Sequence, residues 1–311
     1  TAVLFAVMAF AGGWMFFLTF YKLYPALHKC VASSILFIPT VVFWGSGIFK
    51  DTVTLSALGV ATYSFHRVFI EHRMRILSVL LMLLSFWIIF SIKKYILLCF
   101  LPALLLWWAA SYLSRISSKM LRMIVAPLTG AIAIFLSYYA VLKVGEDDPR
   151  YSINRLAETA KITAYDIRYG WGARTGDGSG YTLGELDGSW QSIVSLAPQA
   201  INISLFRPYL WEVKNTLMLL SALEGLVLLS LTVLAIWRVR WKLFLYLQMP
   251  DVLFCFIFAV VFAFAVGVST FNFGTLSRYK IPMMPYFLLV LGMVDAYWKR
   301  DRKREELASG E

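Results

Sequence analysis

The stretch ILSVLLMLLSFWIIFSIKKYILLCFLPALLLWWAASYL, residues 76–113, decides the fold class. It holds two long apolar runs, 76–92 and 95–113, with Lys93 and Lys94 between them. A transmembrane helix needs roughly 20 predominantly apolar residues, with a range of about 17–25. Each run therefore predicts one membrane-spanning helix, and the two lysines mark the boundary between the spans.

The composition of the whole chain also indicates a membrane protein. Of the 311 residues, 60% are hydrophobic and only 15% are charged, and the mean hydropathy is +0.71. Soluble domains are about 45–50% apolar. These values exclude a soluble globular protein and predict that most of the chain lies in a lipid bilayer.

We therefore expect an all-α, polytopic transmembrane helix bundle of about nine spans, with one long outer loop that contains an amphipathic helix. The candidate spans are 1–20, 31–49, 52–66, 76–92, 95–113, 121–143, 215–237, 251–271 and 281–298. Residues 1–20 carry no charged n-region, so they are expected to span the membrane rather than act as a signal peptide. Because 52–66 is short, 31–66 could instead form a re-entrant hairpin.

The spans divide the chain into three parts. Residues 1–143 form an N-terminal bundle of about six spans, and 144–213 form an extracytoplasmic loop or lid. Residues 214–311 supply about three further spans and a basic cytoplasmic tail. The cysteines Cys30, Cys99 and Cys255 are widely spaced and predict neither a disulfide framework nor a metal site.

The short loops predict the orientation. One set carries sixteen lysines and arginines, and the alternate set carries five. The larger set comprises Lys22, Lys29, Arg67, Arg73, Arg75, Arg115, Lys119, Arg122, Arg238, Arg240, Lys242, Lys299, Arg300, Arg302, Lys303 and Arg304. The positive-inside rule places this set in the cytoplasm, with the N-terminus outside and the C-terminus inside. The net charge of +11 is then partly a topology signal and does not indicate nucleic-acid binding.

The long loop of about residues 144–213 is the only large segment that is not apolar. Ile153, Leu156, Ala160, Thr163 and Ile167 recur at helical spacing, which predicts an amphipathic helix over 151–168 that lies on the bilayer or covers a cavity. Loops of this length in compact proteins are more often functional than passive connections.

Several cations stand on the face that the positive-inside rule expects to be cation-poor. Lys50, Arg207, Arg278 and Lys280 lie at span ends there, with Tyr279 between the last two. Arginine binds phosphate through two parallel hydrogen bonds. Cations kept on this side indicate an anionic, membrane-resident partner, such as a sugar carried on a polyprenyl phosphate.

The stretch SRYKIPMMP makes the anion site more specific. Pro282 is tolerated in the first turn of a helix, so we expect the last span to begin near Ile281. Its N-terminus, the positive end of the helix dipole, would then lie beside Arg278 and Lys280 and bind an anion.

Three short segments resemble bacterial polytopic proteins of polysaccharide synthesis. IPTVVFWGSGIFKD (38–51) is similar to their P-S-x-x-x-W-S-S-x-x-x-[KR]-[DE] segment, and LFRPYLWE (205–212) to their aromatic-proline segment before a span. SRYKIPMMP (277–285) is similar to their R-Y-x-x-P-x-x-P. The three occur in the family's order and extend over most of the chain. The family comprises membrane glycosyltransferases of the GT-C type and O-antigen or exopolysaccharide polymerases. The chain departs from the GT-C pattern because it lacks their long, acidic first outer loop.

The resemblance implies an integral-membrane glycosyltransferase or polysaccharide polymerase that acts on a polyprenyl-phosphate-linked sugar at the outer face of a bacterial inner membrane. Lys50, Arg207, Arg278, Tyr279 and Lys280 are the candidate substrate-binding residues, and Asp51 and Asp166 are candidate bases for the attacking hydroxyl. No metal or cofactor is expected.

Glu224 is a third candidate catalytic residue, because it is an acid well inside a span. An intramembrane carboxylate is costly and needs a partner or a cavity. It could act as a base or a cation-binding group, or it could accept a hydrogen bond from a Ser, Thr or Tyr of a neighbouring helix.

Two other function classes fit the same residues. A transporter or flippase for the same lipid would use the same cations without a base. A non-catalytic subunit of an envelope complex would use 144–213 as a docking surface for other envelope-biosynthesis proteins.

Overall fold

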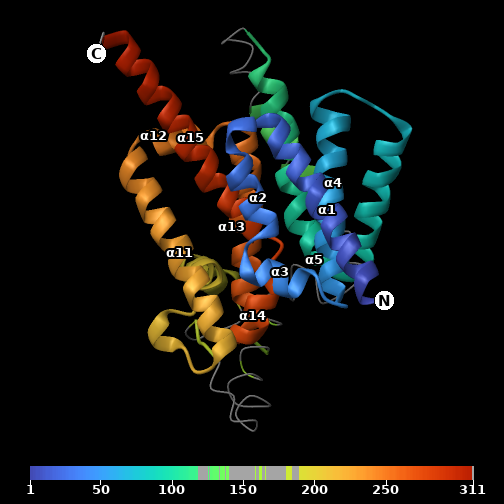
Figure 1. The fold of residues 1–311 in the computed structure, drawn as a ribbon, viewed down its shortest axis with the longest axis vertical. Helices are drawn as coiled ribbons and strands as arrows, with labels where there is room; N and C mark the ends of the chain where they lie inside the picture. Colours follow the sequence, from blue (N-terminus) through green and yellow to red (C-terminus); the bar gives the residue numbers. More distant parts are fainter. Residues whose placement is uncertain are drawn as a thin grey trace.

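The computed structural model describes residues 1–117, 180–183 and 189–309, together with scattered positions between 125 and 165. Within these residues the regular structure is helical, apart from an isolated bridge between Gly180 and Asn272. Long helices lie side by side along one axis (Figure 1). The expected all-α, membrane-type helix bundle is therefore confirmed.

The α-helices follow one another along the chain with few intervening residues in the described parts. They are α1 (Ala2–Leu23), α2 (His28–Leu36), α3 (Pro39–Gly45), α4 (Lys50–Phe65), α5 (Ile76–Ser114), α9 (Trp190–Ser195), α10 (Ala197–Phe206), α11 (Thr216–Val239), α12 (Lys242–Leu247), α13 (Pro250–Thr270), α14 (Phe273–Tyr279) and α15 (Met284–Ser309). Shorter turns of other helix types are η1 (Pro25–Leu27), η2 (His66–Ile70) and η4 (Leu210–Glu212).

Among the residues that the structure describes, four helices are long and apolar enough to cross a membrane, or up to six if each of two bent pairs is one span. The four are α1, α5, α11 and α13. The expected count of about nine is larger because the expected spans 76–92 and 95–113 both lie in α5, and α4 has only 16 residues. Expected span 121–143 is described only in part, and an apolar helix over Pro127–Leu136 lies within it.

α5 turns back on itself at Lys93, whose backbone angles (φ −144°, ψ 77°) are not helical. Arg115, just after the helix, hydrogen-bonds to His72 and to the carbonyl of Ile70, just before it. The two ends of α5 are therefore close together, and Lys93 lies at the opposite end of the bundle. The two spans expected from the opening stretch form a helical hairpin.

Two bends interrupt the helices, one inside expected span 31–49 and one at the start of expected span 281–298. Between α2 and α3 the axis bends by 51° at Phe37 and Ile38, and between α14 and α15 it bends by 67°. Pro39 occupies the first turn of α3, where a missing N–H costs no hydrogen bond.

The last span does not begin as expected. α15 starts at Met284, and Lys280–Met283 form a turn. The expectation of a helix N-terminus at Ile281 is therefore wrong, because α14 continues its hydrogen bonding to Lys280, whose N–H donates to the carbonyl of Leu276.

α4 is the most enclosed helix of the N-terminal part, and it packs against α1 and α5. Its side chains are largely small, so neighbouring backbones approach closely. A Cβ on Gly12 of α1 would lie 2.4 Å from Cα of Ser56, and one on Gly59 would lie 2.2 Å from the carbonyl oxygen of Gly12. Small residues permit this approach where helices associate in membranes.

α4 shows the course of the chain over 31–66. Asp51 in its first turn lies beside Lys93, and His66, directly after its last residue, lies beside Glu71, which pairs with Lys22. α4 therefore runs the length of the bundle and returns the chain to the end at which Lys22 lies, so α2, α3 and α4 together form a hairpin that starts and finishes at that end.

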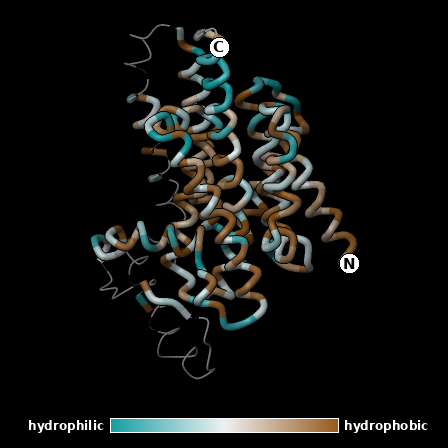
Figure 2. The backbone as a smooth tube through the Cα atoms, turned by 60° about the vertical axis from the view of Figure 1, so that its left-hand side comes forward, coloured by the Kyte–Doolittle hydropathy of each residue, from teal (hydrophilic) through white to brown (hydrophobic). Residues whose placement is uncertain are grey.

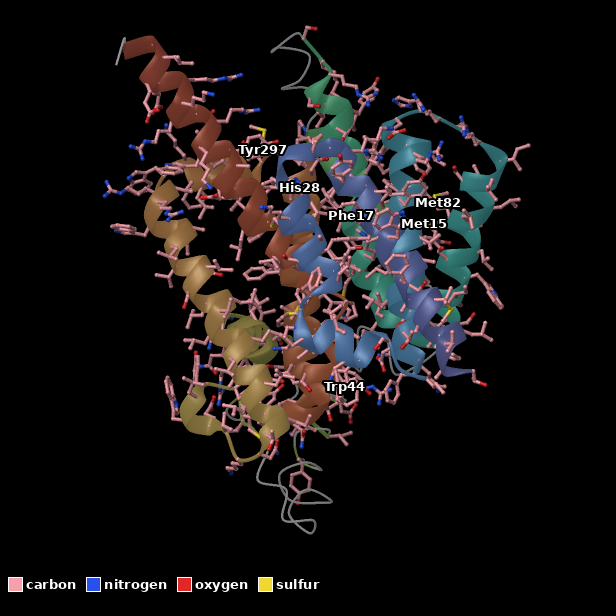
Figure 3. The ribbon with its side chains drawn as sticks, in the orientation of Figure 1. Met15, Phe17, His28, Trp44, Met82 and Tyr297 are labelled. Atoms are coloured by element: carbon pink, nitrogen blue, oxygen red, sulfur yellow. The ribbon has the colours of Figure 1, made fainter. Side chains whose placement is uncertain are left out.

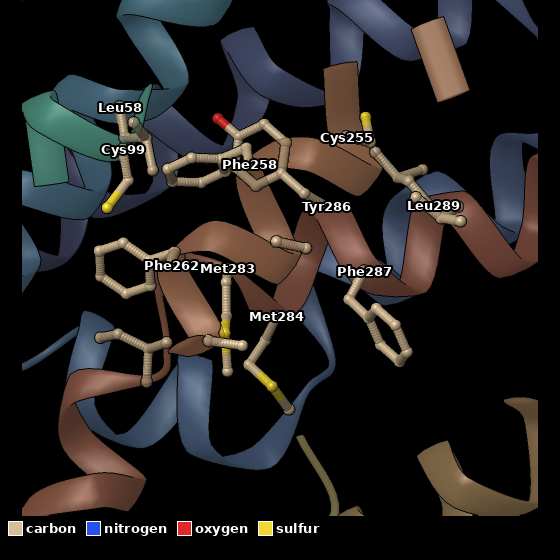
Figure 4. Packing of buried hydrophobic residues seen from close by; sticks show 14 of the residues in the cluster. Leu58, Cys99, Cys255, Phe258, Phe262, Met283, Met284, Tyr286, Phe287 and Leu289 are labelled. Atoms are coloured by element: carbon tan, nitrogen blue, oxygen red, sulfur yellow. The ribbon is translucent and has the colours of Figure 1, made fainter. Parts of the chain in front are cut away.

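The core at the centre of the bundle is aromatic. Tyr286 of α15 lies edge-on to Phe258 of α13 and Phe16 of α1, and its hydroxyl hydrogen-bonds to Thr62 of α4. Figure 4 shows Tyr286 and Phe258 with their neighbours from α13, α15 and α5. The core joins the N-terminal and C-terminal parts, so the two expected bundles form one helical assembly.

Hydrophobic residues occupy the middle of the helices, and hydrophilic residues gather toward the two ends (Figure 2). Lys242 pairs with Glu305 and Lys22 with Glu71 at one end, which we call the Tyr297 end. Asp51 pairs with Lys93 and Arg278 at the other, the Asp51 end. Figure 3 places Tyr297 and Trp44 at these opposite ends. A multi-pass membrane protein is the arrangement that this pattern supports.

Candidate functional site

Asp51 is the centre of the first charged cluster. It lies in the first turn of α4, where a carboxylate interacts favourably with the helix dipole. Lys93, at the turn of α5, donates a hydrogen bond to Oδ1, and Nε of Arg278 from α14 donates to Oδ2. Asp51 is only 1% exposed, so one buried carboxylate binds two cations from two distant parts of the chain.

Four aromatic rings surround the two cations. The guanidinium carbon of Arg278 lies 5.1 Å from the ring centre of Phe49 and 5.7 Å from that of Trp44. Nζ of Lys93 lies 4.6 Å from the ring centre of Tyr279 and 5.8 Å from that of Tyr95. Aromatic faces stabilise cations, most strongly where water is excluded.

Glu224 of α11 is the centre of a second cluster. Its Oε2 accepts a hydrogen bond of 2.9 Å from the backbone N–H of Thr40, and its Oε1 accepts one of 2.8 Å from the Thr40 hydroxyl. The break before α3 leaves the N–H of Thr40 without a helical partner, and Glu224 supplies one.

Lys280 completes this second cluster. Its Nζ lies 3.7 Å from Oε1 of Glu224, and the side chain is 0% exposed. In the part of the chain that the structure describes, this ammonium has no hydrogen-bond partner. An ammonium buried with an ion pair alone is costly and calls for an explanation.

Arg207 forms a separate clamp before α11. It donates two hydrogen bonds to Glu212, and Oε2 of Glu212 also accepts one of 2.8 Å from the N–H of Tyr209. Partial burial acts to raise the pKa of Glu212, but the bonds from Arg207 and Tyr209 prevail and hold that pKa below its usual value. The guanidinium carbon also lies 5.3 Å from the ring centre of Phe273.

A short segment of the long loop is fastened nearby. The N–H of Tyr181 donates to the carbonyl of Phe271, and its hydroxyl contacts the hydroxyl of Thr270 at 2.6 Å. Tyr181 and Leu183 are buried. This segment of the loop thus packs on the junction of α13 and α14, next to Arg207.

A cavity of about 210 Å³ opens between α3, α11 and α14. Its lining residues are Thr40, Phe43, Trp44, Asn215, Leu217, Met218, Leu220, Ser221, Phe273, Gly274 and Ser277. Trp44 joins it to the Asp51 cluster, and Thr40 joins it to the Glu224 cluster.

The structure brings most of the predicted site residues to one end of the bundle. Asp51 and Arg278 are in direct contact, Tyr279 stacks near Lys93, and Lys280 pairs with Glu224. Lys50 is exposed beside Asp51, and Arg207 is bound to Glu212. Asp166 and the amphipathic helix predicted over 151–168 lie outside the described residues.

The expectation that Arg278 and Lys280 form one anion site is corrected in two respects. Each cation is paired with a different carboxylate, and the helix start that was to complete the site lies further along the chain. For Glu224, the contact with Thr40 is the hydrogen bond that sequence analysis allowed as an alternative.

Three features of the site were not selected from the sequence. Lys93 is recognisable there only as one of two boundary lysines, and Thr40 and Ser221 as polar residues in apolar runs. Pairing across 42 positions, as for Asp51 and Lys93, has no local signal. Among the described residues no group of three or more His, Cys, Asp or Glu side chains could hold a metal ion.

No protein-family model, curated protein or solved structure matches this chain. The class of protein that the fold defines is an all-α, multi-pass membrane protein with two buried carboxylate–cation clusters at one end.

Proposed function

We propose that this chain is an integral-membrane glycosyltransferase or polysaccharide polymerase that acts on a polyprenyl-phosphate-linked sugar at the outer face of a bacterial inner membrane. The observation that carries the proposal is the Asp51 cluster, in which a buried carboxylate holds Lys93 and Arg278 among four aromatic rings. This combination supplies both a proton acceptor and groups that bind an anion.

The proposed reaction forms one bond and breaks one. The hydroxyl oxygen of the acceptor sugar attacks the anomeric carbon of the donor, and the bond from that carbon to the phosphate oxygen breaks. The hydroxyl proton passes to the carboxylate of Asp51. The leaving phosphate keeps the bonding electron pair, and Arg278 and Lys93 stabilise its charge.

Substrate binding would activate the site by exchange of partners. Without substrate, Asp51 neutralises both cations. A phosphate that binds Arg278 through two hydrogen bonds competes with the carboxylate for the guanidinium. Asp51 is then released as a base next to the leaving group, and the exposed Lys50 adds positive charge beside it.

The test is transfer by purified protein in liposomes that contain a polyprenyl-phosphate-linked sugar. Asp51→Asn is expected to abolish transfer while the lipid still binds. Asp295→Asn is the matched control, because Asp295 also pairs with two cations, Arg238 and Lys299, but on α15 toward the Tyr297 end. Transfer that survives in a well-folded Asp51→Asn protein would refute Asp51 as the base. A parent protein that binds the lipid without any transfer would refute the transferase and favour a transporter of the same lipid.

A further inference from the structure

The cavity between α3, α11 and α14 contains no charged lining residue, although charged clusters lie on two sides of it. Its polar lining side chains are Thr40, Asn215, Ser221 and Ser277. Its volume of about 210 Å³ is below the roughly 300–1,000 Å³ of pockets for drug-sized ligands. The cavity therefore suits one small polar group and not a long polymer.

The hydrogen bonds of the lining residues determine what they offer to a ligand. The hydroxyl of Thr40 donates to Glu224, and the hydroxyl of Ser277 donates to the carbonyl of Gly274. Each has given its only hydrogen to the protein, so toward the cavity it can only accept. Asn215 uses Oδ1 to cap α11 by accepting from the N–H of Met218, and its Nδ2 is the group that can donate.

This pattern selects between two kinds of head group. A fully ionised phosphate can only accept, so it would meet lone pairs at Thr40 and Ser277, with the carboxylate of Glu224 directly behind Thr40. A ring that carries hydroxyl groups both donates and accepts, and it matches Thr40, Ser277, Asn215 and the buried hydroxyl of Ser221.

The aromatic lining favours a ring as well. Trp44, Phe43 and Phe273 line the cavity, and flat aromatic faces pack well against the apolar face of a ring. The ring centre of Trp44 also lies 5.7 Å from the guanidinium carbon of Arg278. One side chain thus joins the uncharged cavity to the cationic cluster.

The rim shows how a ligand would arrive. Phe43 and Leu217 are 51% and 60% exposed, and Leu220 is exposed beside them. In a membrane protein, exposed apolar residues on a spanning helix face lipid. The cavity therefore offers four polar side chains among mainly apolar walls and has an apolar mouth, which fits a lipid whose head group enters sideways.

We propose that this cavity binds the uncharged, hydroxyl-bearing ring of a glycolipid, separately from the phosphate group, which lies at Arg278. The inference deepens the proposed function and rests on it for the identity of the natural lipid. Ser221 and Asn215 are then the residues that distinguish a sugar ring from other head groups.

The test uses the full chain in phosphatidylcholine nanodiscs and measures lipid binding by native mass spectrometry. The probes are a monoglycosyl diacylglycerol, the diacylglycerol without sugar, and phosphatidic acid, all with the same acyl chains. The glycosylated lipid is expected to bind best. Ser221→Ala and Asn215→Asp are each expected to weaken binding of the glycosylated lipid roughly two- to tenfold, which corresponds to the loss of one hydrogen bond.

Two features keep the test specific. Asn215→Asp retains the oxygen that caps α11, so the helix is preserved while the amide donor is lost. Ser230→Ala is the matched control, because Ser230 is exposed on the same helix and bonds only to the carbonyl of Leu226.

Stronger binding of phosphatidic acid, or glycolipid binding that is equal in Ser221→Ala and the parent, would overturn the inference. Because the binding assay needs no transfer, its outcome is independent of the Asp51→Asn assay. Either idea can therefore fail while the other stands.

Discussion

The pair formed by Glu224 and Lys280 allows a stringent test of the buried site. At the separation of 3.7 Å and an effective dielectric constant of about 20, Coulomb's law gives an attraction of about 4 kcal/mol. Both groups are buried, so removing one charge leaves the other unpaired in an apolar interior. Breaking a buried pair in this way typically costs about 3–5 kcal/mol.

We therefore expect Glu224→Gln and Lys280→Met each to lower the free energy of unfolding by about 3–5 kcal/mol. The double variant is expected to recover about 2 kcal/mol or more relative to either single change, because no unpaired charge remains. In the double variant the Gln carbonyl can still accept a hydrogen bond from Thr40, and Met occupies the space of the lysine stem.

The assay is reversible unfolding in mixed micelles with increasing SDS, followed by tryptophan fluorescence, on all four proteins of the cycle. Lys242 and Glu305 provide the control cycle, since they form an exposed ion pair at 2.6 Å and should couple weakly. Additive losses in the Glu224–Lys280 cycle would show that the two groups do not interact, and the reasoning from burial and distance would be wrong.

Three further predictions concern the same end of the molecule. Arg278→Ala, in a deletion strain at matched protein level, is expected to lower polymer yield about tenfold to hundredfold, because it removes a charged hydrogen bond to phosphate. Arg278→Lys is expected to recover the yield only partly, because the planar guanidinium is lost. Near-normal yield from Arg278→Ala would reduce this residue to a structural partner of Asp51. The pKa of Glu212 is held below its usual value of 4.5, so its ionised side chain stabilises the fold above pH 4.5 and this stabilisation is lost as the pH falls below that value. Measured as free energy of unfolding against pH, the acid-dependent loss is expected in the parent and not in Glu212→Gln. Parallel curves for the two proteins would contradict this prediction. Ser179→Cys is expected to react with an impermeant thiol reagent in intact cells, and reaction only after the inner membrane is permeabilised would reverse the orientation.

The residues of the site that could be predicted are those whose signal lies within a short stretch of sequence. Asp51, Arg278 and Lys280 were selected because charge at a span boundary is visible in a window of a few residues. Their partners could not be selected in this way, since Arg278 and Asp51 are 227 positions apart. Lys280 and Glu224 meet only because α11 packs against the breaks in two helices.

The sequence by itself determined that the helices lie in lipid, that the fold is all-α, and that charged residues gather at the two ends of the helices. These properties depend on apolar length and on cation distribution, which are local quantities. Breaks in the helices were signalled only weakly, by Pro39 and Pro282, because a proline permits a bend without specifying its angle. The tertiary structure decided which carboxylate neutralises which cation, and where Thr40, Asn215 and Ser221 enclose an uncharged cavity. Pairing and enclosure require surfaces from helices far apart in the chain, and only packing in three dimensions brings those surfaces together.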